Sequence, residues 1–321
     1  MLKYHRILID ISNVYYRAFS TSPYLTAEVE GRRMATGGIF KSIKMIQRIE
    51  RDYLDTGGRL YFLFDNALSG EYRRKEIDPD YKINRKKRES QFYRGLDYLQ
   101  LVLMHYQTGY RVVRRPASEA DDLIAPILES FGKKPYFILL VSNDMDWSRA
   151  IKDRVHWMAH KDGRDVIYNA DTFCGEYGFR PGLDEVCLYK AIRGDASDNI
   201  PPGVKNIPET AVLDIIRQAK SVPNLFRYLA DLNIPFQWKE AVRQSRGRIL
   251  LNFRLVNYQP VSGAECRECT SVTEFNKDML SMFYRILNFK PEGIDGRLRK
   301  PDLPPREEDF FKEFDVYPRA E

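Results

Sequence analysis

Acidic residues recur along this chain at the points where short apolar segments end. Asp10 follows RILI and Asp65 follows LYFLF, while Asp144 and Asp146 follow the run FILLVS. Short apolar runs that alternate with helical patterns are typical of buried strands in a mainly parallel sheet. Because ligands of such sheets gather at the carboxyl ends of the strands, the sequence predicts that these side chains converge.

The spacing of apolar residues predicts an α/β fold with a mainly parallel central sheet covered by helices. Strands are expected over 6–10, 59–64, 110–113, 136–141, 154–159 and 164–169, and helices over 12–20, 36–53 and 91–106. From residue 183 onward the pattern becomes helical. We therefore expect an α/β core over 1–182, a helical region over 183–290 and an irregular tail over 291–321.

The bulk properties place few limits on function but exclude some classes of protein. The 321 residues have a mean hydropathy of −0.48 and contain no apolar run long enough to span a membrane. The first residues resemble a strand and not a signal peptide, and four scattered cysteines do not form a disulfide framework. The cysteine usage fits a reducing cytosol.

Two further acidic clusters accompany the strand ends, in SEADD and in RGDASDN. A single Asp after a strand is usually a turn residue or a helix N-cap, and Ser118 is itself expected to cap a helix. Five clusters at equivalent positions instead favour a pair of Mg²⁺ ions, which Mn²⁺ can replace. The expected metal ligands are Asp10, Asp65, Glu119, Asp121, Asp122, Asp144, Asp146, Asp195 and Asp198.

Five motifs carry a resemblance to a known family. ILIDISNVYYRAF, LFDN, SEADDLIA, VSNDMD and GDASDNIPPGV occur in the order found in the flap endonuclease (5′-nuclease) family. This family includes the 5′→3′ exonuclease domain of bacterial DNA polymerase I and phage-encoded 5′ exonucleases. The resemblance spans about 6–216 and implies a PIN-like 5′-nuclease core with a helical arch and an appended helix–turn–helix region.

Positive charge is concentrated in segment 72–94, which holds nine Lys or Arg residues against four Asp or Glu residues. A solvated loop is the ordinary interpretation of such a run, but the resemblance implies a basic arch over 66–95 through which a single-stranded 5′ end passes. It implies that Lys82 and Arg85 act on the scissile phosphate. Tyr72, Tyr81, Phe92 and Tyr93 offer rings for base stacking. Further nucleic-acid contacts are expected from Arg17, Arg73, Arg74, Lys86, Lys87 and Arg88.

The segment after RGDASDN differs from the family pattern. The family has a glycine-rich hairpin there that grips duplex DNA and can hold a monovalent cation. This chain keeps Gly203 but has Asn206, Ile207 and Pro208 where the hairpin glycines are expected. Gly203 and Lys205 are expected to contact phosphate, while the cation site is in doubt.

The resemblance implies a metal-dependent 5′ nuclease that acts on DNA with single-stranded 5′ ends or flaps, and on RNA in RNA–DNA hybrids, in replication or primer removal. It further implies a cytoplasmic monomer of a bacterium or of a phage-infected cell, which a sliding clamp or a single-strand-binding protein could assist. One alternative is a structure-specific nucleic-acid-binding protein without turnover, and another is a ribonuclease of the PIN type. The four cysteines, Cys174, Cys187, Cys266 and Cys269, leave a structural zinc as a weaker alternative for the metal.

Overall fold

The computed structural model describes residues 2–22, 24–65, 74–85 and 90–289. The chain forms two compact units. Unit 1 comprises 1–70, 88–116 and 264–321, and unit 2 comprises 71–87 and 117–263. The basic segment is thus divided between the units, and residues on both sides of the expected 182/183 boundary belong to unit 2.

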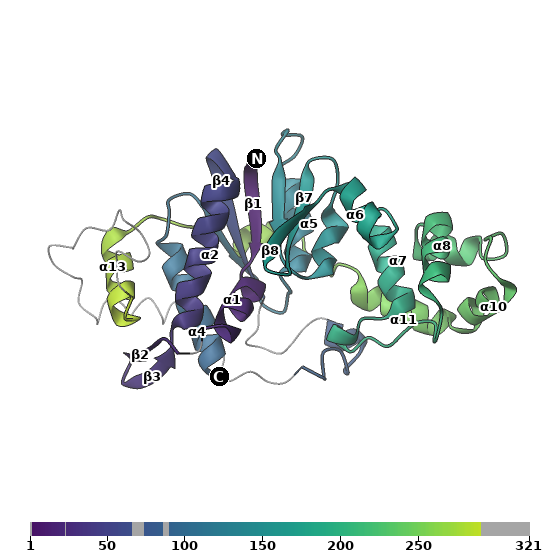
Figure 1. Ribbon diagram of the computed structural model, residues 1–321, viewed down its shortest axis with the longest axis horizontal. Helices are drawn as coiled ribbons and strands as arrows, with labels where there is room; N and C mark the ends of the chain where they lie inside the picture. The colour runs from purple at the N-terminus through teal and green to yellow at the C-terminus, as the bar shows by residue number, and fades with distance from the viewer. Residues whose placement is uncertain (1, 23, 66–73, 86–89, 290–321) are drawn as a thin grey trace. The chain divides into compact units, whose positions relative to one another are not determined.

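The main sheet strands of unit 1 are three parallel strands and an antiparallel edge strand, of which β1 and β4 are labelled in Figure 1. β1 (Tyr4–Asp10) pairs with β4 (Leu54–Phe64), and β4 pairs with β5 (Arg111–Arg114), both in parallel. β9 (Thr270–Val272) is antiparallel to β5. The apolar runs that predicted β1 and β4 are buried, since Ile7, Leu8 and Ile9 are fully enclosed.

Amphipathic helices cover this part of the sheet. Apolar residues of α2 recur at helical spacing, and Ile39, Ile43, Ile46 and Ile49 are all buried, as the sequence predicts. Phe92 is also in this core, with its ring centroid 5.0 Å from that of Tyr15. The other elements of unit 1 are α1 (Ile11–Ser20), β2 (Thr26–Val29), β3 (Arg32–Ala35), α2 (Gly37–Tyr53), α4 (Ser90–Met104), α12 (Gly263–Glu268, whose first residue belongs to unit 2) and α13 (Lys277–Ile286).

Unit 2 combines a small sheet with many helices. β6 (Ile138–Val141) pairs in parallel with β7 (Val155–Lys161), which pairs in antiparallel with β8 (Arg164–Tyr168). The helices are α3 (Arg74–Ile77), α5 (Ile124–Ser130), α6 (Ala170–Tyr177), α7 (Leu183–Arg193), α8 (Glu209–Ala219), α9 (Val222–Arg227), α10 (Phe236–Gln244) and α11 (Arg246–Val256). Three 3₁₀ turns, η1 (Asp121–Leu123), η2 (Met145–Ala150) and η3 (Ala196–Asp198), carry most of the acidic motifs.

A buried cluster joins α7 and α11 to the segment after α3. It contains Tyr81, Cys187, Ile200, Leu255 and Val256. This packing fixes the ends of α7 and α11 next to the acidic turns η1, η2 and η3.

The α/β fold with mainly parallel strand pairing is confirmed. Ser118 does not cap the helix that follows it, because that helix begins as η1 with Ala120 at the N-cap position and no side-chain cap. The tail 291–321 lies outside the described residues, and the duplex-binding role of the helices after residue 183 stays a prediction. Within the described part of the chain, no helix has the length and apolar character needed to cross a membrane.

Candidate metal centre

Six carboxylates of unit 2 form two groups with the spacing of metal ligands. Glu119, Asp121 and Asp122 are the first group; Asp146, Asp195 and Asp198 are the second. Within each group, one oxygen from every residue lies within 4.8 Å of the others. Carboxylates this close repel one another unless cations lie among them.

The first group is buried at the start of η1. Exposed fractions are 6% for Glu119, 7% for Asp121 and 2% for Asp122. The main-chain nitrogen of Gln259 donates to Asp122 Oδ1 at 2.8 Å. These side chains therefore have few contacts with bulk water, and their charge must be balanced from within the protein.

The second group is built on two capped 3₁₀ turns. Asp144 caps η2 by accepting a hydrogen bond from Asp146 N at 2.9 Å, and Asp195 caps η3 by accepting from Ser197 N at 2.9 Å. Asp195 uses Oδ1 for the cap and Oδ2 for a contact of 2.8 Å with Lys190 Nζ. The roles of cap and cation ligand are thus compatible at Asp195, which follows α7.

Arg74 fills the middle of the first group. Its guanidinium contacts Glu119 and lies 2.9 Å from Asp122 Oδ1 and 3.5 Å from Asp121 Oδ2, while Nε donates to Leu255 O at 2.7 Å. The residue is only 2% exposed. The expectation that Arg74 is one of several general phosphate contacts is wrong for this structure, because its donors are used by buried acceptors.

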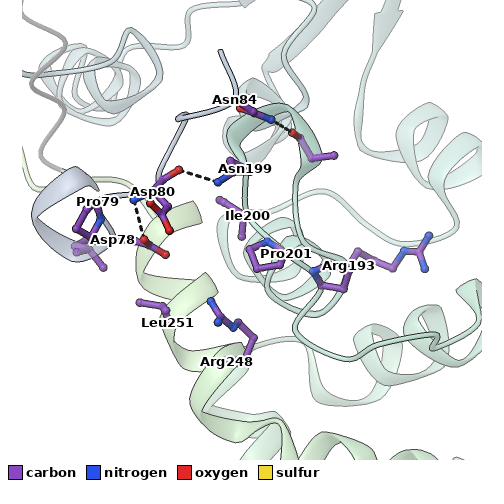
Figure 2. Close-up of a pocket in the computed structure, with 13 residues that line it drawn as sticks. Asp78, Pro79, Asp80, Asn84, Arg193, Asn199, Ile200, Pro201, Arg248 and Leu251 are labelled. Carbon is purple, nitrogen blue, oxygen red and sulfur yellow. Dashed lines mark hydrogen bonds between the residues drawn. The ribbon is translucent and has the colours of Figure 1, made fainter. Parts of the chain in front are cut away.

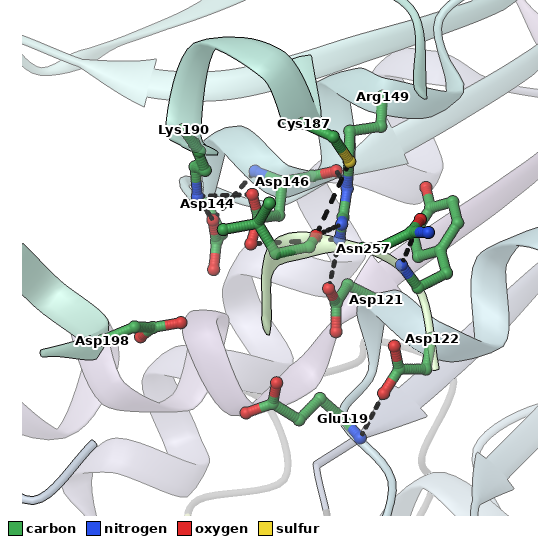
Figure 3. A network of polar contacts seen from close by, with 12 residues as sticks. Glu119, Asp121, Asp122, Asp144, Asp146, Arg149, Cys187, Lys190, Asp198 and Asn257 are labelled. Carbon is green, nitrogen blue, oxygen red and sulfur yellow. Dashed lines mark hydrogen bonds and ion pairs between the residues drawn. The ribbon is translucent and has the colours of Figure 1, made fainter. Parts of the chain in front are cut away.

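Four more cations contact the two groups, and Figure 3 shows two of them, Arg149 and Lys190. Arg149 contacts Asp121, and Lys190 contacts Asp146 and Asp195. The two cations that the resemblance implies for catalysis are also here. Lys82 contacts Glu119 and lies 3.7 Å from Asp198 Oδ2, and Arg85 Nη2 lies 2.5 Å from Asp198 Oδ1.

The net formal charge of the described carboxylates and their cations is negative. With Asp144, the described residues of unit 2 bring seven carboxylates and five cationic side chains to this place, so two formal negative charges are left among them. Carboxylate oxygens are the ligands that Mg²⁺ and Mn²⁺ prefer. The donor chemistry and the residual charge therefore fit a divalent cation.

The first group pairs a strong acid with a weak one. Although burial raises it, the ammonium of Lys82 and the guanidinium of Arg74 lower the pKa of Glu119 to about 2. Burial and the charge of Asp121 raise the pKa of Asp122 to about 7, despite the opposing effect of Arg74. Near neutral pH, Asp122 is thus the member of this group that exchanges a proton.

Tyr81 connects the two groups. Its hydroxyl lies 3.0 Å from Glu119 Oε2 and 2.9 Å from Asp198 Oδ2, so it can donate its proton to either carboxylate. The ring is 2% exposed and packs in the α7–α11 cluster. The expected base stacking on Tyr81 and Phe92 is therefore not available here, because both rings are in a core.

Side-chain amides fasten the segment that carries Lys82 to the loop that carries Asp198 (Figure 2). Asn84 Nδ2 donates to Ala196 O at 2.8 Å, and Asn199 Nδ2 donates to Asp80 O at 2.9 Å. Lys82 has a left-handed backbone, with φ of 57°, and its nitrogen donates to Asp198 O. These bonds line a cleft of about 750 Å³ and fix the positions of Lys82 and Arg85.

Two expected ligands lie in unit 1. Asp10 ends β1 and caps α1 by accepting from Asn13 N at 2.9 Å, while Asp65 follows β4 and its nitrogen donates to Ser12 Oγ at 3.0 Å. Their part in a metal centre stays a prediction, as does the phosphate contact expected of half-buried Arg17 on α1. Arg73, Lys86, Lys87 and Arg88 lie outside the described residues, as does Tyr72.

The altered hairpin keeps one glycine for a packing reason. A Cβ at Gly203 would lie 2.1 Å from Ala191 O, so only glycine fits beside α7. Asn206 adopts a left-handed backbone with φ of 56°, and Pro208 precedes α8 and has no N–H to donate. Lys205 is exposed, and its contact with phosphate stays a prediction.

The sequence analysis missed Arg149 and Lys190, which are two of the five cations. Both occur in helical segments, three residues after Asp146 and five residues before Asp195 respectively. The spacing from Asp146 to Arg149 is that of neighbours on one helical face, and it could have been noticed. The cysteines belong to neither group, because the groups with ligand spacing in the described part of the chain contain carboxylates alone.

The geometry can be compared with known proteins. Residues 5–178 match the family described as 5′-3′ exonuclease, N-terminal resolvase-like domain. The chain belongs to the 5′-3′ exonuclease family. This confirms the resemblance that the five ordered motifs indicate.

Relatives in sequence include stand-alone and fused proteins. The 5′-3′ exonuclease of Buchnera aphidicola subsp. Schizaphis graminum is 26% identical over 233 residues, which are 72% of this chain and 76% of that protein. A thermostable DNA polymerase I of Thermus thermophilus is 27% identical over 224 residues, or 70% of this chain. The matched region is 25% of that polymerase.

Solved structures share the fold. The bacteriophage T5 flap endonuclease, described as a pseudo-enzyme-product complex with DNA and metal ions, has a TM-score of 0.60 and 21% identity, with 88% of this chain and 97% of that one covered. The catalytic core of Rad2 in complex with DNA substrate has a TM-score of 0.55 and 13% identity, with 92% of each chain covered. The 5′-nuclease fold thus extends over most of this chain.

Proposed function

We propose that this chain is a metal-dependent 5′ nuclease that hydrolyses phosphodiester bonds of DNA from a 5′ end or at a junction of single and double strands. The observation that carries the proposal is the pair of carboxylate groups in unit 2, each with ligand spacing, in a chain of the 5′-3′ exonuclease family. Their residual negative charge calls for divalent cations next to a polyanionic substrate.

Mg²⁺ is the cofactor we propose, with two ions, and Mn²⁺ as its substitute. Glu119, Asp121 and Asp122 would hold one ion, and Asp146, Asp195 and Asp198 the other, because all six ligands are hard oxygen donors. A pair of such ions supplies activation of the attacking water and stabilisation of the leaving oxygen in phosphodiester hydrolysis. Asp144, Asp10 and Asp65 would add charge to the same centre.

Lys82 and Arg85 are proposed to bind the scissile phosphate. Arg85 is suited to meet substrate, since its side chain is 44% exposed while it contacts Asp198. Lys82 is 9% exposed and is fixed by the bonds between its segment and the loop 196–199. A phosphate that approaches the carboxylates would thus find one exposed and one buried donor for its developing charge.

The substrate class proposed is DNA with single-stranded 5′ ends or flaps, and RNA in RNA–DNA hybrids as a second substrate. Support comes from the relatives, which include DNA polymerase I, and from the neighbours solved with DNA. Removal of primers during replication would need this activity. A sliding clamp or a single-strand-binding protein is proposed as an assisting partner, and a cytoplasmic monomer as the active form.

The test is cleavage of a 5′-labelled flap duplex with Mg²⁺ and with EDTA. We expect cleavage near the junction only with Mg²⁺, and a loss of more than a hundredfold in turnover for Asp146→Asn. Asp171→Asn is the matched control, because Asp171 is 81% exposed and pairs only at the surface with Arg180. Tight binding of the flap without cleavage would instead indicate a binding protein without turnover.

A further inference from the structure

Arg149 is a fully buried cation that contacts parts of both carboxylate groups. Its side chain has no exposed surface. Nη2 contacts Asp121 of the first group and lies 3.9 Å from Asp146 Oδ2 of the second. Figure 3 shows its guanidinium between these two acids.

Every nitrogen of this guanidinium has an acceptor. Nε donates to Asp146 O at 2.8 Å, and Nη1 donates to Val256 O at the end of α11. One face of the group lies 4.1 Å from the ring centroid of Tyr258. Arg149 therefore ties η2 to η1 and to the segment after α11, with the planar fork that a lysine lacks.

Burying a charged side chain is unfavourable unless ion pairs and hydrogen bonds compensate for its lost hydration. Packing alone could be achieved at this position by an apolar side chain of similar volume. Lys82 and Tyr81 connect the groups at Glu119 and Asp198, whereas Asp121 and Asp146 share only Arg149 among the contacts seen in the described residues. The charge of Arg149 is thus what holds these two carboxylates near each other.

We propose that Arg149 is a positioning residue that acts as a built-in cation between the two carboxylate groups. It keeps Asp121 and Asp146 in place before a divalent ion binds, and it reduces the negative charge that attracts that ion. The proposal rests on the proposed function only in that it takes these groups to bind divalent cations.

A charge role and a packing role predict opposite effects of Arg149→Gln. If the charge matters, the metal-free protein becomes less stable, while divalent ions bind more tightly because one positive charge has left their site. If Arg149 only packs, a disturbed site binds the ions equally or more weakly. The direction of the change in affinity therefore separates the two roles.

The experiment measures melting temperature in EDTA and in excess Mn²⁺, and Mn²⁺ affinity by calorimetry, with the full chain. For Arg149→Gln we expect a melting temperature in EDTA lower by roughly 10 °C, much of it restored by Mn²⁺. Mn²⁺ affinity should rise about tenfold. Arg149→Lys keeps the charge and should bind Mn²⁺ as the wild type does. Arg180→Gln, which removes the same charge from an exposed pair with Asp171, should change neither quantity.

An Mn²⁺ affinity of folded Arg149→Gln that is equal to or weaker than that of the wild type would overturn the proposal. If Arg149→Gln does not fold, the double variant Asp121→Asn with Arg149→Gln decides. A charge role predicts that the double variant folds, because both partners are neutral. A double variant that also fails to fold would count against the charge role. Wild-type protein that binds Mn²⁺ but does not cleave DNA would contradict the proposed function and leave this inference standing.

Discussion

The two carboxylate groups of unit 2 differ in the cations that balance them. The first is balanced by Arg74, Arg149 and Lys82, whose side chains are 3%, 0% and 9% exposed. The second is balanced by Lys190, which is 7% exposed, by the shared Lys82, and by Arg85, which is 44% exposed. Every cation of the first group is thus buried, whereas one cation of the second is open to solvent. Removing one partner of a buried ion pair costs more stability than removing one partner of an exposed pair.

The cations of the first group are also hydrogen-bonded to the backbone. Arg74 donates to Leu255 O and Arg149 to Val256 O, which are carbonyls in the last turn of α11. Such carbonyls have no partner within the helix and lie at the negative end of its dipole. The same two arginines thus balance the acids and complete the end of α11, so the first group is part of the structural core of unit 2.

The largest difference between the groups should appear in stability without metal. Arg74→Gln leaves Asp122 buried without its cation and Glu119 with Lys82 alone, and we expect a loss of about 3–5 kcal/mol in the free energy of unfolding. Arg85→Gln removes a half-exposed partner of Asp198, and we expect a loss of about 0–1 kcal/mol. Urea unfolding in EDTA measures both values.

Equal losses in the free energy of unfolding for Arg74→Gln and Arg85→Gln would contradict the difference between the two groups. A smaller loss for Arg74→Lys than for Arg74→Gln would show that the charge of Arg74 contributes apart from its fork of donors, since lysine keeps the charge but lacks the fork. Circular dichroism at zero urea provides the control that each variant is folded before unfolding begins.

A smaller effect should appear in the pH dependence of metal binding. The pKa of Asp122 is raised to about 7, and a carboxylate must lose its proton to bind a metal ion. Metal affinity should therefore increase as pH rises through 7 and level off above pH 8. Glu119 should not contribute to this pH dependence, because its pKa is lowered to about 2.

Calorimetry of Mn²⁺ binding at pH 7, in two buffers with different ionisation enthalpies, measures the protons released. We expect about half a proton from Asp122 at pH 7, a similar share from Asp144, whose pKa burial and the charge of Asp146 also raise to about 7, and almost none from either at pH 8.5. Asp122→Asn is the comparison variant, since it should remove only the Asp122 share of this release. Heats that are the same in both buffers at pH 7 would contradict the account of Asp122.

The sequence predicted the strands, most helices and the acidic motifs, because these depend on local patterns. The apolar run before Asp10 indicated β1, and the spacing of Ile39 and Ile43 indicated α2. What it could not predict was how the basic segment is buried, since that depends on contacts between distant residues. Arg74 is 181 residues from Leu255, its main-chain acceptor.

The same limit explains the errors at aromatic residues. Tyr81 and Phe92 lie in a segment of high charge, where exposed rings for base stacking were a reasonable expectation. Tertiary packing places Tyr81 against α7 and α11 and Phe92 against Tyr15. Lys190 was missed for a related reason, because its helical segment has an ordinary composition; only the three-residue spacing from Asp146 could have pointed to Arg149.

The most direct measurement is the anomalous diffraction of crystals grown with Mn²⁺. The account predicts a Mn²⁺ peak within about 2.5 Å of oxygens of Glu119, Asp121 or Asp122, and another at Asp146, Asp195 or Asp198. It also predicts that Arg149 stays in contact with Asp121 in that state. Crystals that diffract well but show no Mn²⁺ at either group would contradict the central claim that these acids form a divalent metal centre.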